Sequence, residues 1–177
     1  MSDLNRIALA LPGTGWTKPR ATLGRLVVDA VLSKPAVIER IALTAPGLDA
    51  EGSVTLRPDG GLEVARFSPV LIGDWLRGSV QITGRGEGRP VGIVLTGGEV
   101  DLRRKPENAG SGEGDGADIP LSIALDRVRI TEGIALTDFR GDFTPRGGFN
   151  GSFVALLNGQ AAVTGTVGLS IGVSVPS

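Results

Sequence analysis

Between Leu76 and Arg104, apolar and polar residues alternate in three short runs that are separated by glycine-rich segments. Val80 and Ile82 fall on one side of the first run, and Ser79 and Gln81 on the other, because successive side chains of a strand point to opposite faces. The pattern predicts three strands, with one turn before Val91 and another at Gly97-Gly98. A sheet of such strands has one apolar face, which needs an apolar partner to cover it.

The rest of the chain repeats this pattern at intervals of about 8 to 12 residues, which is typical of an all-β protein. A phase shift near Phe67 predicts a β-bulge, and one near Asp126-Arg127 predicts a turn or a bulge. Pro58-Asp59-Gly60-Gly61 and Pro145-Arg146-Gly147-Gly148 predict hairpin turns. The strands that we expect outside 76–104 cover 22–32, 37–44, 48–57, 62–70, 119–144, 149–158 and a long final run to Val175.

These strands predict an antiparallel meander of about a dozen strands, in a single β-rich segment over residues 1–177. The 28 glycines and 11 prolines favour short strands over long helices. The meander either forms a curled, twisted sheet with an apolar groove or folds on itself as a β-sandwich, and periodicity leaves both open. Residues 105–118 hold glycine and charge without a large apolar side chain, which indicates a flexible loop.

Composition narrows the functions that the chain can have. Histidine, cysteine and tyrosine are absent, so the commonest general base and the thiolate metal ligands are missing. We therefore predict no enzyme, no metal site and no cofactor. The formal net charge of -1 gives no electrostatic reason to bind nucleic acid. The sequence contains no uninterrupted apolar run of about 18 residues, so it predicts no membrane-spanning helix.

Three local features have ordinary explanations. The glycine-rich sequence from Gly84 to Arg89 lacks the Lys and hydroxyl residue of a phosphate-binding loop, and a hairpin turn explains it better. The basic residues 103–105 are most simply a solvated strand end. Trp16 and Trp75 follow turn sequences, and each either packs in the core or plugs the rim of a sheet.

Three runs, 45–67, 76–104 and 130–153, carry strand-and-turn signatures such as SVTLRPDG and GGEVDLRR. With them the chain resembles the periplasmic part of AsmA-like proteins, YhdP-type members above all, which are relatives of TamB. The resemblance covers most of residues 6–167. It implies a long β-sheet curled around a hydrophobic groove, in a protein of the cell envelope that contributes to outer membrane biogenesis by carrying phospholipid from the inner to the outer membrane.

On this resemblance we expect a segment of a larger array in the periplasm. The remainder of a longer chain would anchor it in the inner membrane, and phospholipid would be its ligand. The aliphatic stripes would then line the groove and hold acyl chains, without any bond being made or broken. The expected lining residues are Val54, Leu56, Leu62, Val64, Val80, Ile82, Val91, Ile93, Leu95, Val100, Leu102, Leu121, Ile123, Leu125, Ile134, Leu136, Val163, Val167 and Leu169.

Two other functions remain open from the residues alone. A β-sandwich or β-solenoid would serve as a structural or adhesive module with the same alternation. An enzyme acting on envelope glycans would need two carboxylates about 5 to 9.5 Å apart in a cleft. The candidates Glu51, Asp59, Glu63, Asp74 and Glu99 show no spacing that pairs them.

Overall fold

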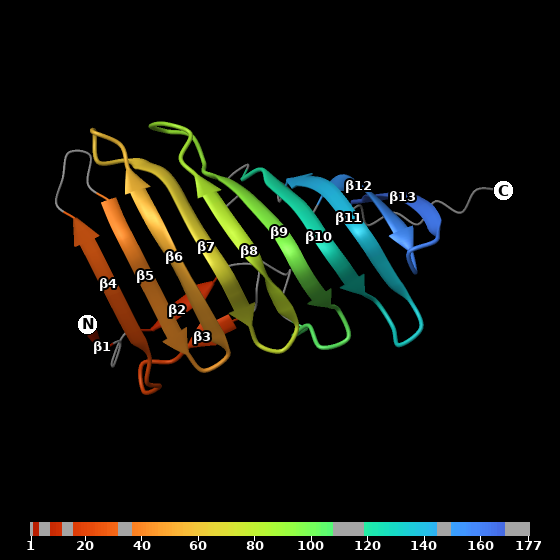
Figure 1. The fold of residues 1–177 in the computed structure, drawn as a ribbon, viewed down its shortest axis with the longest axis horizontal. Coiled ribbons are helices and arrows are strands. Elements are labelled where there is room, and N and C mark those ends of the chain that lie inside the picture. The colour runs from red at the N-terminus through yellow and green to blue at the C-terminus, as the bar shows by residue number, and fades with distance from the viewer. Residues whose placement is uncertain are drawn as a thin grey trace.

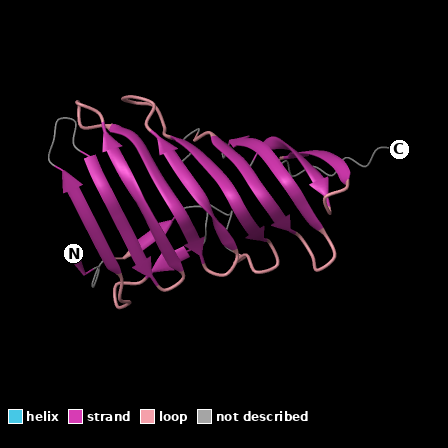
Figure 2. Ribbon diagram, viewed as in Figure 1, coloured by secondary structure: helices cyan, strands magenta, loops and turns pink. Residues whose placement is uncertain are grey.

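The computed structural model describes residues 2–3, 8–11, 16–31, 37–107, 119–144 and 150–168, and over these residues the protein is all-β (Figure 2). Because these residues form no helix, none of them makes a helix that could cross a membrane. The strands are β1 (Ser2–Asp3), β2 (Leu9–Leu11), β3 (Trp16–Lys18), β4 (Arg25–Val31), β5 (Val37–Ala45), β6 (Leu48–Leu56), β7 (Leu62–Ile72), β8 (Leu76–Thr83), β9 (Gly92–Asp101), β10 (Leu121–Arg129), β11 (Ala135–Thr144), β12 (Asn150–Leu157) and β13 (Ala161–Val167).

Eleven of the strands form one open sheet in the order β1-β4-β5-β6-β7-β8-β9-β10-β11-β12-β13 (Figure 1). From β4 onward, neighbours in the sheet are also neighbours in the chain, so the predicted meander is confirmed. The predicted turn at 58–61 is formed between β6 and β7, where the Gly61 carbonyl accepts the Arg57 N–H at 2.7 Å. The turn predicted at 145–148 lies outside the described residues.

One pair departs from the expected antiparallel order. β10 runs parallel to β9, with Leu121 opposite Ile93 and Val128 opposite Val100. Antiparallel strands can be joined by a tight turn, whereas a parallel pair needs a crossover of about a dozen residues or more. The chain between β9 and β10, residues 102–120, is long enough for such a connection. Residues 108–118, most of the predicted flexible loop, lie outside the described part of the chain.

The predicted turn at Gly97-Gly98 is wrong. β9 continues through both glycines to Asp101, and the register with β8 shifts between Arg77 and Ser79. Gly97 and Gly98 adopt φ values of 64° and 77°, a conformation that glycine accepts without strain. The two glycines therefore form a bulge inside one strand, which changes the phase of the apolar residues without reversing the chain.

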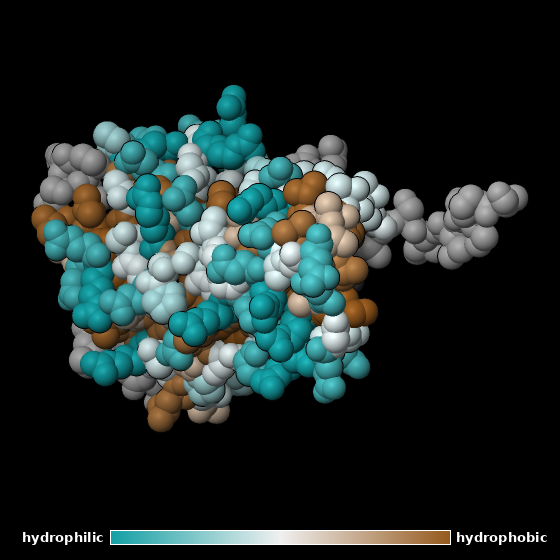
Figure 3. Space-filling model, turned by 45° about the vertical axis from the view of Figure 1, so that its right-hand side comes forward, coloured by the Kyte–Doolittle hydropathy of each residue, from teal (hydrophilic) through white to brown (hydrophobic). Residues whose placement is uncertain are grey.

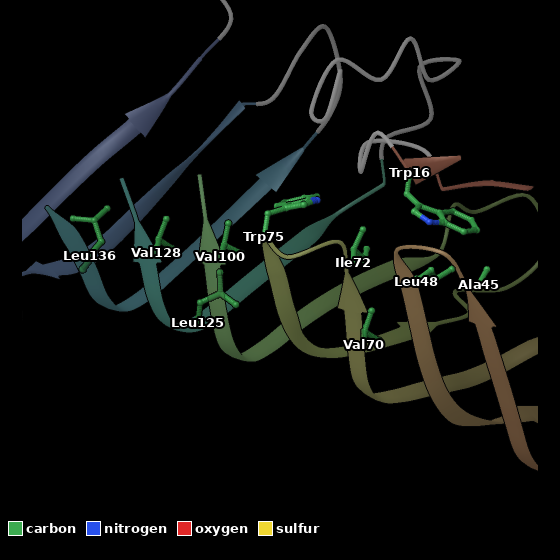
Figure 4. Packing of buried hydrophobic residues seen from close by; sticks show 11 residues of the cluster. Trp16, Ala45, Leu48, Val70, Ile72, Trp75, Val100, Leu125, Val128 and Leu136 are labelled. Atoms are coloured by element: carbon green, nitrogen blue, oxygen red, sulfur yellow. The ribbon is translucent and has the colours of Figure 1, made fainter. Parts of the chain in front are cut away.

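The bulge predicted near Phe67 is confirmed, because the register of β7 against β8 shifts between Phe67 and Val70. The phase shift predicted at Asp126-Arg127 is also confirmed, since Leu125 and Val128, three residues apart, are both buried in the same cluster. A bulge bends its strand and increases the local twist. Several strands thus bend at similar heights, and the sheet curls, as the curved ribbons in Figure 4 show.

The smaller sheet consists of β2 and β3 alone and lies behind β4–β7 in the view of Figure 1. Trp16 of β3 belongs to the same buried cluster as Ala45 and Leu48, and its Nε1 donates to the Pro46 carbonyl at 2.9 Å. This hairpin covers only one corner of the large sheet. Within the described residues no second large sheet opposes the first, so the β-sandwich alternative is not formed there.

Candidate functional site

The candidate site is the face of the large sheet on which the β2–β3 hairpin lies, which we call the inner face. Residues directly opposite each other on neighbouring strands project their side chains to the same face, so the strand registers trace rows of side chains across the sheet. Three such rows lie on the inner face, and each is named after one of its members.

The Val80 row crosses ten strands through the middle of the inner face. Every member is an aliphatic residue, phenylalanine or glycine, and each is opposite the next. In order from β4 to β13 the row is Val28, Ile41, Gly52, Phe67, Val80, Leu95, Ile123, Gly141, Phe153 and Gly165.

The Val54 row runs beside it, also across ten strands, and it too contains no polar side chain. Its members, from β4 to β13, are Ala30, Ile38, Val54, Ala65, Ile82, Ile93, Leu121, Phe143, Gly151 and Val167. At about 4.8 Å between neighbouring strands, each of the two rows is roughly 43 Å long.

The Leu48 row crosses β5–β13 at the other end of the strands and forms most of the buried core (Figure 4). Trp16 and Trp75 are both buried beside it, at 8% exposure each, so the core-packing interpretation of the two tryptophans is confirmed. The row comprises Ala45, Leu48, Ile72, Leu76, Val100, Val128, Leu136, Leu157 and Ala161.

Burial distinguishes the Val80 row from the Leu48 row. Six members of the Leu48 row are buried, whereas no member of the Val80 row is. Val28, at one end of the Val80 row, is 39% exposed. The other members of the Val80 row are partly buried, and several of them pack against the buried cluster. The described part of the chain thus leaves this apolar row partly uncovered, and a contiguous apolar surface is a candidate binding surface.

The opposite face of the sheet, the outer face, is mostly polar at the corresponding height. One row there consists of Ser53, Arg66, Gln81, Val94, Ser122, Asp142, Ser152 and Thr166, which are opposite one another from β6 to β13. We call it the Gln81 row. Figure 3 shows the outer face obliquely, with hydrophilic side chains over much of the surface and hydrophobic ones among them. The sheet therefore has an apolar inner face and a mostly polar outer face.

Toward β13 the inner face changes from aliphatic to aromatic. The rings of Phe139 and Phe153 stack with centroids 5.1 Å apart. A Cβ atom on Gly165 would come within 2.5 Å of the Phe153 ring, and one on Gly141 within 2.6 Å of the Phe143 ring. The Phe153 and Phe143 rings therefore lie flat over Gly165 and Gly141, because these glycines have no side chain that would displace the rings.

The structure brings most of the predicted lining residues together on the inner face. Val64 is an exception: it is opposite Thr55 and Thr83 and so faces outward, because the register between β6 and β7 shifts beside it. Residues placed on the inner face by the registers, or by alternation within a regular strand, are Val54, Leu56, Leu62, Val80, Ile82, Ile93, Leu95, Val100, Leu121, Ile123, Leu125, Leu136, Val163 and Val167.

The remaining predicted residues lie beyond the strand ends. Val91 precedes β9, Ile134 precedes β11 and Leu102 follows β9, with Ile134 and Leu102 exposed at 43% and 40%. Leu169 is outside the described residues. The sequence pattern also failed to indicate some members of the Val80 row and the Val54 row, notably Phe67, Phe143 and Phe153. Each phenylalanine lies two residues from another inner-face position, Ala65, Gly141 or Gly151. Because these neighbours are small, the alternation of large apolar residues is not visible in the sequence.

Several charged side chains gather in a pocket of about 440 Å³ beside the Trp75 turn. Its charged lining residues are Asp74, Arg77, Glu99, Asp101, Arg103, Arg104 and Arg129. Here Asp101 is held by two short bonds from Arg103, at 2.6 and 2.8 Å, while Glu99 pairs with Arg129 at 2.9 Å. The hydrogen bonds from Arg103 lower the pKa of Asp101 to about 2. Arg103 and Arg104 thus lie at a strand end, as the sequence indicated, and both are ion-paired there with acidic side chains.

Of the carboxylates proposed for glycan chemistry, Asp74 and Glu99 line the pocket beside the Trp75 turn, and each is paired with an arginine. Glu51 pairs with Arg40, and Asp59 belongs to the 58–61 turn. A general acid needs a raised pKa, whereas the pKa of Asp59 is lowered, chiefly by the Gly61 N–H. Within the described part of the chain no three acidic side chains cluster as a metal ion would require. None of these groups offers a better candidate site than the inner face.

No protein-family model, curated protein or solved structure matches this chain. The fold and the site define its class: an all-β protein built on one open, curled sheet whose inner face is apolar from edge to edge.

Proposed function

We propose that the chain is a non-enzymatic lipid carrier segment that holds phospholipid acyl chains against its inner face. The observation that carries this proposal is the Val80 row, which crosses ten strands without a polar side chain and without one fully buried residue. Acyl chains require apolar contact of this kind and no directional bonds, so a row of Val, Leu, Ile and Phe suits them.

The dimensions are compatible with this ligand. The hydrocarbon of one bilayer leaflet is about 15 Å thick, so an acyl chain needs roughly a third of the row's length of about 43 Å. The row could accept more than one lipid in succession, and a lipid could shift along it without meeting a polar barrier. The polar head group would remain in water, since the rows are open along one side.

The wider role follows from the resemblance to AsmA-like proteins. In this proposal the chain is one segment of a bridge-like carrier in the periplasm, tethered to the inner membrane by other parts of a longer protein, and it moves phospholipid toward the outer membrane. The continuous apolar rows support such a conduit, because each strand adds one more apolar position to the track.

The test uses two substitutions in neighbouring residues of β8. Val80→Glu places a carboxylate in the middle of the Val80 row, whereas Gln81→Glu places the same group on the outer face. The chain and both variants are purified without detergent, mixed with phosphatidylethanolamine vesicles that carry pyrene-labelled phospholipid, and separated from them. We expect the chain and Gln81→Glu to retain labelled lipid and Val80→Glu to retain at least tenfold less.

Circular dichroism checks that both variants are folded before the comparison. Equal retention of lipid by Val80→Glu and Gln81→Glu, or the absence of lipid from the unsubstituted chain, would contradict the proposed function.

A further inference from the structure

The outer edge of β13 differs from an ordinary sheet edge. β13 comprises seven residues, and no described strand pairs with its outer side. Its sequence, AAVTGTV, has no charged residue and no proline. Soluble proteins usually protect an edge strand with lysine, proline, a bulge or a cover, because free N–H and C=O groups otherwise bind another strand. β13 contains neither lysine nor proline, and it has no bulge against β12, because the register between the two strands is regular.

The opposite edge of the sheet shows the contrast. β4 carries Arg25 and Asp29, and β1 pairs with its first two residues. This edge is thus partly covered and carries charged residues, as expected of an edge that does not pair with a further strand. The asymmetry singles out β13 as the edge adapted to receive a further strand.

We infer that β13 binds β13 of a second copy of the chain in an antiparallel pair, forming a symmetric dimer. A two-fold axis perpendicular to the sheet brings the two identical edges together, and both inner faces then lie on the same side. Symmetric dimers of this type are the commonest assembly of identical chains, because one self-complementary surface suffices.

The residues of β13 agree with a pair centred on Thr164. This register pairs all seven residues and places Thr164 opposite the same residue of the second copy. On the inner face, Val163 then meets Gly165 of the other copy, and Ala161 meets Val167, so each larger side chain is opposite a smaller one. The apolar rows would continue from one copy into the next without a polar interruption.

Cysteine cross-linking tests this register directly, because the chain contains no cysteine. We expect Thr164→Cys to form a disulfide-linked dimer within minutes of mild oxidation at about 50 µM protein, a concentration at which a micromolar dimer is well populated. Ser152→Cys, on the outer face of the interior strand β12, is the matched control and should remain monomeric on a reducing-agent-free gel.

A charge swap tests the same contact without a covalent bond. Thr164→Lys places two like charges opposite each other across the axis, so sedimentation should show at least a tenfold weaker dimer. Mixing Thr164→Lys with Thr164→Glu should restore the dimer, which a merely misfolded variant could not do. A chain that stays monomeric at about 100 µM, or open-ended oligomers larger than a dimer, would overturn the inference.

Discussion

The Asp126 carboxylate accepts a hydrogen bond from the backbone N–H of Gly98 at 2.7 Å, and so connects the bulges of two neighbouring parallel strands. The two residues are 28 positions apart in the chain, and β9 and β10 are the only parallel neighbours among the described strands. A side chain thus supplies a bond at the point where the pairing of β9 with β10 is interrupted, between Thr96 and Glu99.

Removing this acceptor should destabilise the sheet at its parallel joint. We expect Asp126→Ala to lower the free energy of unfolding by about 1 kcal/mol, the usual net value of one hydrogen bond, and to lower the melting temperature by about 2 to 4 °C. Asp126→Asn keeps an oxygen acceptor and should recover most of the loss. Thermal melts followed by circular dichroism measure both, and an Asp126→Ala melting curve that overlays the original one would refute the role of this bond.

The Gly98 bulge should tolerate no side chain. A Cβ atom at Gly98 would lie 2.0 Å from the Arg77 carbonyl oxygen, which belongs to the backbone of the neighbouring strand. Gly60 has a similar positive φ of 86°, but a Cβ atom there would meet nothing within 4 Å, so it isolates the conformational cost. We expect Gly60→Ala to lose about 1 kcal/mol and Gly98→Ala at least about 3 kcal/mol, as measured by urea unfolding. Equal losses would show that the close approach to Arg77 is unimportant.

The stability of the sheet should fall in acid through Asp101. Its pKa is lowered from 3.8 to about 2 in the folded protein, mainly by the hydrogen bonds from Arg103. Because the folded state holds the charged form, this contribution is present above pH 4 and is lost as the pH falls from about 4 through about 2. Asp101→Asn should flatten the dependence of the unfolding free energy on pH in this window. An unchanged slope in the variant would assign the acid sensitivity to other carboxylates.

The β2–β3 hairpin should be separable from the sheet that it covers. Trp16 fixes it through a buried ring and the 2.9 Å bond to the Pro46 carbonyl, and truncating a buried tryptophan costs about 3 to 5 kcal/mol. We expect Trp16→Ala to accelerate amide exchange in residues 16–18 at least tenfold while β7–β9 keep their protection. Trp16→Phe, which keeps a ring but loses the bond, should give a smaller change. Uniform loss of protection over the sheet would show that the hairpin and the sheet unfold together.

The sequence predicted the strands of this fold well because period-two alternation follows directly from strand geometry. Strands β5 and β6 end within one residue of the expected limits, since turn residues such as Pro46-Gly47 mark them locally. Gly97-Gly98 misled the prediction because two glycines serve a turn and a bulge equally well. Only the register against Arg77 and Ser79, a contact between strands, distinguishes the two.

The candidate site could be predicted only in part for the same reason. Alternation places Val80 and Ile82 on one face of a strand, but it does not say which face of the next strand continues the row. Val64 shows the consequence, because the register shift beside it turns an apparently matching residue outward. Phe153 was missed because its role depends on Gly165 of the neighbouring strand, over which its ring lies.

The most direct test of the central claim is site-specific photo-cross-linking to lipid on the two faces of the same strands. A photoreactive amino acid is introduced singly at Val80, Leu95 or Ile123 of the Val80 row, and at Gln81 or Ser122 of the Gln81 row as controls. After irradiation with radiolabelled phospholipid vesicles, we expect lipid adducts from the three inner-face positions and none from the two outer-face positions. Equal labelling of both faces, or labelling of the outer face alone, would contradict a lipid track on the inner face.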